Sequence, residues 1–185
     1  MDVSHVIEQF WLSRTEEAFC ALFEVVYPRL RRYFLLRGME IAEAEDLSQN
    51  VMIVIHRHAG DVRDELLFQG WIFKVAKNEL ARYWRQRQTR ERIAGMEPLS
   101  DLLTATLVAE TSEDGNNNFS EWLSHLDAPE RELLILRFVE GLSYEELALA
   151  LGIPVGTVKW RLFSVKKKLA PIINNSSTGR HRRVH

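Results

Sequence analysis

The sequence predicts an all-α chain of two small helical domains joined by a flexible linker. Apolar residues recur at three- and four-residue intervals, strand-like alternation is absent, and a polar, acidic stretch separates the two periodic parts. We therefore expect one domain over 1–92, a linker over 93–118, a second domain over 119–172 and a disordered basic tail over 173–185.

The first domain is predicted to contain a helix that Thr15 caps and Gly38 ends. Pro28 lacks an amide hydrogen, so we expect this helix to kink or restart there. Cys20 follows Phe19 near the apolar face, which predicts a packing role for the thiol. The buried face itself is predicted to hold Phe19, Leu22, Phe23, Val26 and Leu30.

Two further helices complete the first domain. One is expected over 41–58, where residues 59–61 break it, and the other from residue 70 or 71 to about residue 92. A polar loop over 61–69 joins them. Their apolar faces are predicted to hold Leu47, Val51, Val54, Ile55 and His58 in the first helix, and Ile72, Val75, Ala76, Leu80 and Tyr83 in the second.

The second domain is predicted to contain three helices with clear start and stop signals. Two pairs with capping-box spacing, Asp127 with Glu130 and Ser143 with Glu146, open the first two helices. A glycine ends each of these two, and Pro171 ends the third. The expected helices span 128–140, 143–151 and 155–169.

Residues 143–168 have the pattern of a helix-turn-helix. The small residue Ala148 is followed four positions later by the turn glycine, Gly152, and six positions after that by the apolar Val158. The second helix is basic, and such a helix enters the major groove with its N-terminus first. This pattern predicts DNA binding, and an ordinary helical hairpin with a basic exterior is the alternative.

Positive charge is concentrated in two segments, although the formal net charge is −2. Residues 71–92 carry 7 basic and 2 acidic side chains, and residues 154–185 carry 8 basic and none acidic. Two separate basic segments predict two contacts with phosphates, and two solvated helix faces are the alternative.

The composition argues against several other classes of protein. A single cysteine excludes an internal disulfide framework, and no apolar run approaches the roughly 20 residues of a membrane helix. The N-terminus does not resemble a signal peptide, so we expect a cytoplasmic protein without membrane insertion. His56 and His58 would point about 200° apart on a helix, and no phosphate loop or nucleophile motif is present. The sequence therefore predicts no enzyme, no cofactor and no metal site.

Five segments, in order and at matching spacing, resemble motifs of one bacterial family, the extracytoplasmic-function sigma factors. YPRL at 27–30 is similar to the family's YYPRL, EAEDLSQNV at 43–51 to DAEDLAQEVF, and FQGWIFKVAKN at 68–78 to FRAWLYRIARN. GLSYEELA at 141–148 is similar to GLSYEEIA, and IPVGTVK at 153–159 to VPVGTVKSRL. The resemblance covers about 15–92 and 119–170, and it implies that these parts are sigma regions 2 and 4.

This resemblance implies binding to core RNA polymerase, at the clamp helices of its largest subunit and at its flap. The helix that carries the acidic motif would dock on the clamp helices. Asn50 stands where the family usually has an acid, so the contact there would be neutral. Plain solvation of this face is the alternative. The residues that correspond to the docking surface are Asp46, Gln49, Asn50 and Ile53.

The third helix and the loop before it would read the −10 element of promoter DNA. Unpaired bases can be held by aromatic stacking, worth about 1–3 kcal/mol per base. The loop over 61–69 would hold a flipped base. Trp71 is equally compatible with core packing, whereas Trp84 lies among charges and is expected to be exposed. The candidates are Trp71, Lys74, Lys77, Asn78, Arg82, Tyr83, Trp84 and Arg85.

The helix-turn-helix would read the −35 element. Arginine can bond two acceptors of guanine, and threonine can contact a base or a thymine methyl group. Trp160 stands where the family usually has serine, which leaves the preferred sequence open. The candidates are Arg137, Val155, Gly156, Thr157, Lys159, Trp160, Arg161, Ser164, Lys166 and Lys167.

The resemblance also implies regulation by an anti-sigma factor, often membrane-bound, and a monomeric protein. The competing interpretation is a stand-alone helix-turn-helix regulator that dimerises on a palindromic operator. The two differ in stoichiometry, because a sigma factor binds core polymerase as a monomer and recognises promoters in the holoenzyme.

Overall fold

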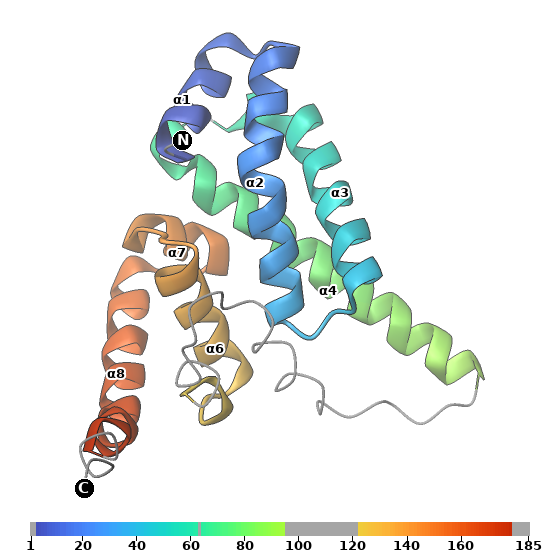
Figure 1. Cartoon of the computed structure of the whole chain (residues 1–185). Coiled ribbons are helices and arrows are strands. Elements are labelled where there is room, and N and C mark those ends of the chain that lie inside the picture. Colours follow the sequence, from blue (N-terminus) through green and yellow to red (C-terminus); the bar gives the residue numbers. More distant parts are fainter. Residues whose placement is uncertain (1–2, 63, 95–121, 179–185) are drawn as a thin grey trace, which may run out of the picture.

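The computed structural model describes residues 3–62, 64–94 and 122–178, and the elements in these ranges are helical (Figure 1). The N-terminal bundle comprises α1 (Val3–Ser13), α2 (Glu16–Leu36), α3 (Ile41–His58) and α4 (Phe68–Ala94), with short 3₁₀ turns at Ala59–Asp61 and Glu65–Leu67. The C-terminal bundle comprises α6 (Ala128–Leu134), a π-helical turn (Ile135–Val139), α7 (Tyr144–Leu151) and α8 (Val155–Thr178). The predicted all-α fold class is confirmed.

Local signals set most of the helix starts as expected. The hydroxyl of Thr15 accepts a hydrogen bond from the amide of Ala18 at 3.3 Å, which caps α2. The predicted box at Asp127 is present, with both reciprocal hydrogen bonds formed at Glu130. The box at Ser143 is also complete, so the starts of α6 and α7 are confirmed.

The restart predicted at Pro28 and the helix end predicted at Pro171 are both absent. Helix α2 continues through Pro28 without a restart, and α8 continues through Pro171 to Thr178. A proline inside a helix costs about 3 kcal/mol. Val26 and Leu30 are buried on either side of the first proline and Leu169 before the second, and burial of about 1.5–3 kcal/mol per side chain offsets that cost. The predicted tail therefore begins inside a helix, and residues 179–185 lie outside the described residues.

Helix α1 was not predicted, although its sequence carries a helical pattern. Val6, Ile7 and Phe10 are buried at three- and four-residue spacing. The ring of Phe10 lies 5.9 Å from that of Phe19 and 6.1 Å from that of Phe68, measured between centroids. These contacts place α1 over the N-terminal ends of α2 and α4.

Four smaller expectations need correction. Phe23, predicted on the buried face of α2, is exposed and stacks on Tyr27 with 4.9 Å between ring centroids. Helix α4 begins at Phe68, two residues early, because the last apolar residue of the loop is drawn into the core. His58 is exposed beside Asp61, at the end of α3 where no other element covers it. Cys20 is exposed because it lies about 100° around the helix from Phe19. Of the predicted linker, residues 95–118 lie outside the described residues, and 93–94 belong to α4.

In the described part of the chain, no single helix has the length and apolarity needed to cross a membrane. Helices α7 and α8 meet that test only as a pair, with a bend of 100° between them.

Candidate nucleic-acid interface

The helix-turn-helix is formed by α7 and α8, which meet at a bend of 100°. Gly152 takes the left-handed conformation (φ +68°), which favours glycine. Its amide and that of Ile153 both donate to the carbonyl of Ala148, at 2.9 and 3.1 Å. Leu147 and Val158 are fully buried where the helices face each other. The predicted helix-turn-helix is confirmed in its geometry.

Helix α8 presents a basic and aromatic face on the side opposite its buried stripe. The stripe contains Val158, Leu162, Val165 and Leu169. Trp160 leaves 67% of its surface exposed, which is unusual for a tryptophan and marks a contact surface. Of the predicted −35 residues on α8, the exposed ones are Gly156, Lys159, Trp160, Lys166 and Lys167, and the half-buried ones are Val155, Thr157, Arg161 and Ser164.

Arg137 has a structural partner in the turn before α7. Its Nη1 donates to the carbonyl of Leu142 at 2.5 Å, and its guanidinium lies 5.0 Å from the centre of the Tyr144 ring. Lys159 approaches the same ring at 5.6 Å. These contacts tie the start of α8 to the start of α7. No role was predicted for Tyr144, and Phe163 was not predicted on the exposed face of α8, although its spacing from Trp160 indicates that position.

The predicted −10 residues fall into two groups along α4. Trp71 is half-buried and stacks on Phe68, with 5.6 Å between ring centroids and 23° between ring planes. Lys77 donates from Nζ to the carbonyl of Leu151 at 3.1 Å, across to the C-terminal bundle. These two side chains take part in packing. The exposed residues are Lys74, Asn78, Arg82, Trp84 and Arg85.

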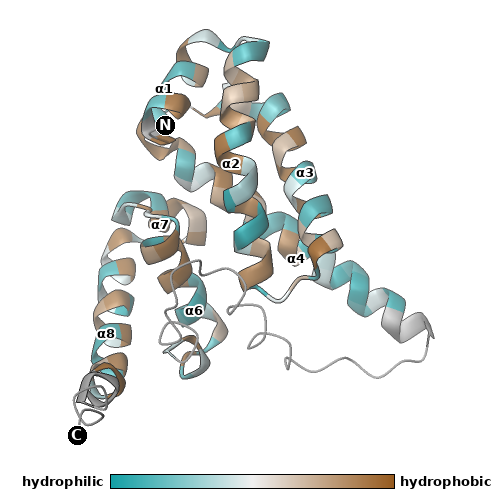
Figure 2. Cartoon of the chain, viewed as in Figure 1, coloured by the Kyte–Doolittle hydropathy of each residue, from teal (hydrophilic) through white to brown (hydrophobic). Residues whose placement is uncertain are grey.

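The second half of α4 is hydrophilic and extends beyond the other helices (Figure 2). There Tyr83 donates a hydrogen bond to the carboxylate of Glu43 and accepts one from Arg87 at 3.1 Å. Burial, followed by the hydrogen bond to Glu43, raises the pKa of the Tyr83 hydroxyl. Trp84 packs edge-on against Tyr83, the guanidinium of Arg87 lies over its ring at 5.5 Å from the centre, and 38% of its surface is exposed.

Helix α3 carries the predicted polymerase-docking residues on one exposed face. Gln49 and Asn50 lie three and four positions after Asp46, and Ile53 lies four and three positions after them, so the four side chains share one face; all are exposed. Ile53 leaves 48% of its surface uncovered among these polar neighbours, which is typical of a protein contact.

The loop before α4 lies beside α7. Asp64 caps its second 3₁₀ turn by accepting from the amide of Leu66 at 3.0 Å, and the Leu66 side chain is 83% exposed. The loop and α7 line a hollow of about 670 Å³ that includes Glu65, Glu145 and Glu146. The predicted base-holding loop therefore faces carboxylates in this arrangement. Among the described residues, these carboxylates included, no group of three or more His, Cys, Asp or Glu side chains is placed to hold a metal ion.

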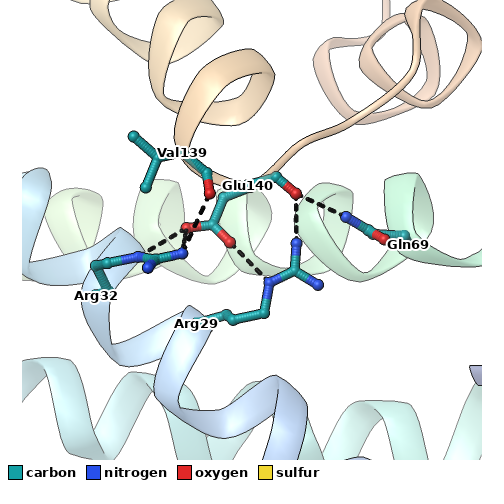
Figure 3. A network of polar contacts seen from close by, with 5 residues as sticks. All are labelled: Arg29, Arg32, Gln69, Val139 and Glu140. Atoms are coloured by element: carbon teal, nitrogen blue, oxygen red, sulfur yellow. Dashed lines mark hydrogen bonds and ion pairs between the residues drawn. The ribbon is translucent and has the colours of Figure 1, made fainter. Parts of the chain in front are cut away.

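A polar network joins the two bundles at the end of the π-helical turn (Figure 3). The carboxylate of Glu140 is fully buried and accepts from Arg29 Nε at 2.9 Å and from Arg32 Nη2 at 2.9 Å. Its backbone carbonyl accepts from Arg29 Nη2 at 2.5 Å and from Gln69 Nε2 at 2.9 Å. Nothing local in the sequence indicated these residues, because the partners of Glu140 are 71, 108 and 111 positions away.

The comparison with known families supports both halves of the chain. Sigma-70 region 2 matches residues 22–90, and Sigma-70 region 4 matches residues 117–169. The RNA polymerase sigma factor CnrH of Cupriavidus metallidurans is 26% identical over 150 residues, covering 76% of this chain and 78% of that protein. The ECF RNA polymerase sigma-E factor of Escherichia coli K12 is 27% identical over 151 residues, covering 74% and 79%.

Two solved structures share the fold. CnrH in complex with the cytosolic domain of CnrY has a TM-score of 0.61 at 20% identity and covers 94% of this chain and 99% of that one. The sigma factor RpoE in complex with the anti-sigma factor NepR from Bartonella quintana has a TM-score of 0.60 at 24% identity, covering 82% and 94%.

Matches to sigma-70 regions 2 and 4 in order, a helix-turn-helix in the second region, and relatives that span most of the chain define a transcription initiation factor. The chain belongs to the sigma-70 family of RNA polymerase sigma factors, and within it to the extracytoplasmic-function group.

Proposed function

We propose that this protein acts in the cytoplasm as a monomeric sigma factor that directs core RNA polymerase to its own set of promoters. The proposal rests on one observation: three helices, α3, α4 and α8, each present one exposed face. The outer face of α3 is amide-rich and acidic, and the exposed faces of α4 and α8 are basic and aromatic. One face suits a protein partner, and two suit DNA.

Each face is assigned one contact. Asp46, Gln49, Asn50 and Ile53 dock on the clamp helices of the polymerase. The exposed part of α4, with the loop before it, reads and holds the −10 strand, where the partly exposed ring of Trp84 is the candidate for stacking on a base. Helix α8 reads the −35 element through its exposed residues, with region 4 also contacting the flap. The domains we assign to these tasks are 1–92 and 119–172, with a linker over 93–118 and a tail over 173–185.

An anti-sigma factor is proposed as the regulator. The support comes from the relative whose solved structure is a complex with the anti-sigma factor NepR, and from the three faces that such a partner would cover. The chain itself supplies no catalytic group in this account. It selects the site, and the polymerase performs the chemistry.

The test uses purified full-length protein and bacterial core polymerase. We expect submicromolar binding at one copy per polymerase, together with new run-off transcripts from a library of genomic fragments. Transcripts that require both elements would establish the function. Tight, specific binding to palindromic DNA by a dimer of the protein alone, without binding to core polymerase, would overturn it in favour of a stand-alone regulator.

A further inference from the structure

A second hollow, of about 310 Å³, lies where α2, α4 and α6 meet. Helix α4 lines it with Lys77, Leu80, Ala81 and Trp84, which share one face because they are spaced three or four residues apart around the helix. The C-terminal end of α2 and the first turns of α6 complete the wall. Pockets for small molecules have volumes of about 300–1,000 Å³, so this hollow can hold one small ligand.

The charges around the second hollow do not balance. Its lining includes one carboxylate, that of Glu132, which pairs with Arg37 at 3.4 Å. Lys77 donates to a neutral acceptor, the carbonyl of Leu151, and the third cation is Arg131. Within the described ranges, neither Lys77 nor Arg131 forms an ion pair with a carboxylate. Two positive charges therefore face the hollow without a counter-charge from the described residues.

Arg131 gives the most direct evidence for a ligand. Its Nε is buried and has no hydrogen-bond partner in the described part of the chain, although its side chain lines the hollow. Buried polar groups in folded proteins are nearly always paired, so an unpaired guanidinium nitrogen calls for an explanation. The guanidinium carries five donors in a planar fork that matches the oxygens of a phosphate. An anion bound at this side chain would supply the missing counter-charge.

The rest of the lining is apolar and aromatic. Leu36 and Leu80 are buried, and Trp84 contributes a ring that is 38% exposed. The other two lining residues, Ala81 and Ala128, are small and exposed, and they leave the space between the larger side chains open. An aromatic ring of this kind can stack on a nucleobase, whatever the base.

The charge balance indicates the class of ligand. A phosphate monoester carries a charge of about −1.5 to −2 at pH 7, which matches the two unbalanced cations. A carboxylate would leave one cation uncompensated, and a triphosphate would exceed both. We propose that the second hollow binds one nucleoside monophosphate, with the phosphate at Arg131 and beside Lys77 and the base against Trp84 and Leu80. This inference goes beyond the proposed function, because the binding requires neither polymerase nor promoter.

Isothermal titration calorimetry of the full-length protein tests the proposal. The probes are adenosine monophosphate and the three other ribonucleoside monophosphates. We expect submillimolar binding of at least one of them, at one site per chain. The matching nucleoside and inorganic phosphate should each bind at least about tenfold more weakly, because each lacks one set of contacts. No binding of any of the four would overturn the proposal, and equal affinity for inorganic phosphate would overturn the nucleotide as its ligand.

Two variants locate the site. Arg131→Gln should weaken binding of the nucleotide at least about tenfold and leave the weaker binding of the nucleoside unchanged, because it removes a contact with the phosphate. Arg57→Gln, at an exposed position of α3, is its matched control. Ala81→Leu should weaken binding of both probes by filling the hollow, and Ala42→Leu, also exposed on α3, is its control.

Circular dichroism checks that all four variants keep the helix content of the parent. Nucleotide binding that survives in both Arg131→Gln and Ala81→Leu would place the ligand elsewhere and overturn the proposal. Because these measurements use the protein alone, a failure here leaves the proposed function standing, and a failure to bind core polymerase leaves this site standing.

Tryptophan fluorescence tests the position of the base. We expect the nucleotide to quench the fluorescence of the parent, and this quenching to be lost in Trp84→Phe. Trp11→Phe, which changes a half-buried ring of α1, is the control and should keep it. Quenching in Trp84→Phe equal to that of the parent would overturn the placement of the base.

Discussion

The hydroxyl of Tyr33 on α2 donates a 2.9 Å hydrogen bond to the carboxylate of Glu132 on α6. Tyr33 is fully buried, and its ring packs edge-on against those of Phe34 and Phe73. Burial, followed by the nearby carboxylate of Glu132, raises the pKa of this hydroxyl well above its ordinary value of 10.0. A buried tyrosine therefore keeps its proton and serves as a donor between regions 2 and 4.

Tyr33→Phe should lower the free energy of unfolding by about 1–3 kcal/mol, because it leaves a buried carboxylate with one donor fewer. Urea unfolding at pH 8 measures the change. Tyr27→Phe is the control, since Tyr27 is half-buried and stacks on Phe23 at 4.9 Å. An equal loss in both variants would show that the Tyr33 hydroxyl contributes nothing specific.

Alkaline pH should weaken the parent more than Tyr33→Phe. The folded protein holds the Tyr33 proton above pH 10.0, whereas the unfolded chain releases it near that value. The unfolded state then binds fewer protons, so stability is fully present below pH 10 and falls as the pH rises further. Unfolding curves between pH 8 and 11 should converge for the two proteins, and parallel curves would contradict the assigned pKa shift.

Substitutions of the two tryptophans of α4 should have different effects, one on promoter melting and the other on the stability of the fold. Trp84→Ala removes an exposed ring and should reduce promoter melting by the holoenzyme about tenfold, with little change in stability. Trp71→Ala removes a ring that stacks on Phe68 and should lower stability by about 3 kcal/mol. Permanganate footprinting measures the first effect and thermal unfolding the second. A Trp84→Ala protein that melts promoters normally would remove this ring from the −10 site.

Arg161→Ala should weaken transcription from −35-dependent promoters about tenfold, because one arginine contact with a base or phosphate is worth about 1–3 kcal/mol. Binding to core polymerase should not change. Abortive transcription and a core-binding titration on the same preparation test both statements. Equal losses in the two assays would mean that this helix does not read the −35 element.

Asp46→Ala combined with Gln49→Ala should produce the opposite pattern. Both side chains are exposed on α3, so the fold should be unaffected. The affinity for core polymerase should fall at least about tenfold, as for side chains central to an interface. Region 4 should still bind a −35 duplex with the parent's affinity. Holoenzyme assembly at the parent's level would remove these two residues from the docking surface.

Signals that lie within a few residues of one another were predictable from the sequence. The boxes at Asp127 and Ser143 and the left-handed turn at Gly152 depend only on local hydrogen bonds and backbone conformation. The behaviour of Pro28 and Pro171 was not predictable in this way, because packing from distant elements decides whether a helix tolerates a proline. The candidate faces on α3, α4 and α8 could be proposed from sequence motifs and charge.

Contacts between the two regions carried no sequence signal. Arg29 and Glu140 are 111 positions apart, and each looks like a solvated charge when its own helix is considered alone. Trp71 and Lys77 were candidates for DNA because their residue types suit it, yet one packs on Phe68 and the other bonds to Leu151. The sequence does not show which polar or aromatic side chains a neighbouring domain will cover.

The outward face of α3 stays uncovered while regions 2 and 4 are packed together. The proposed docking surface is therefore accessible in this arrangement, and a partner can bind it without breaking the hydrogen bonds that Glu132 and Glu140 make between the two regions.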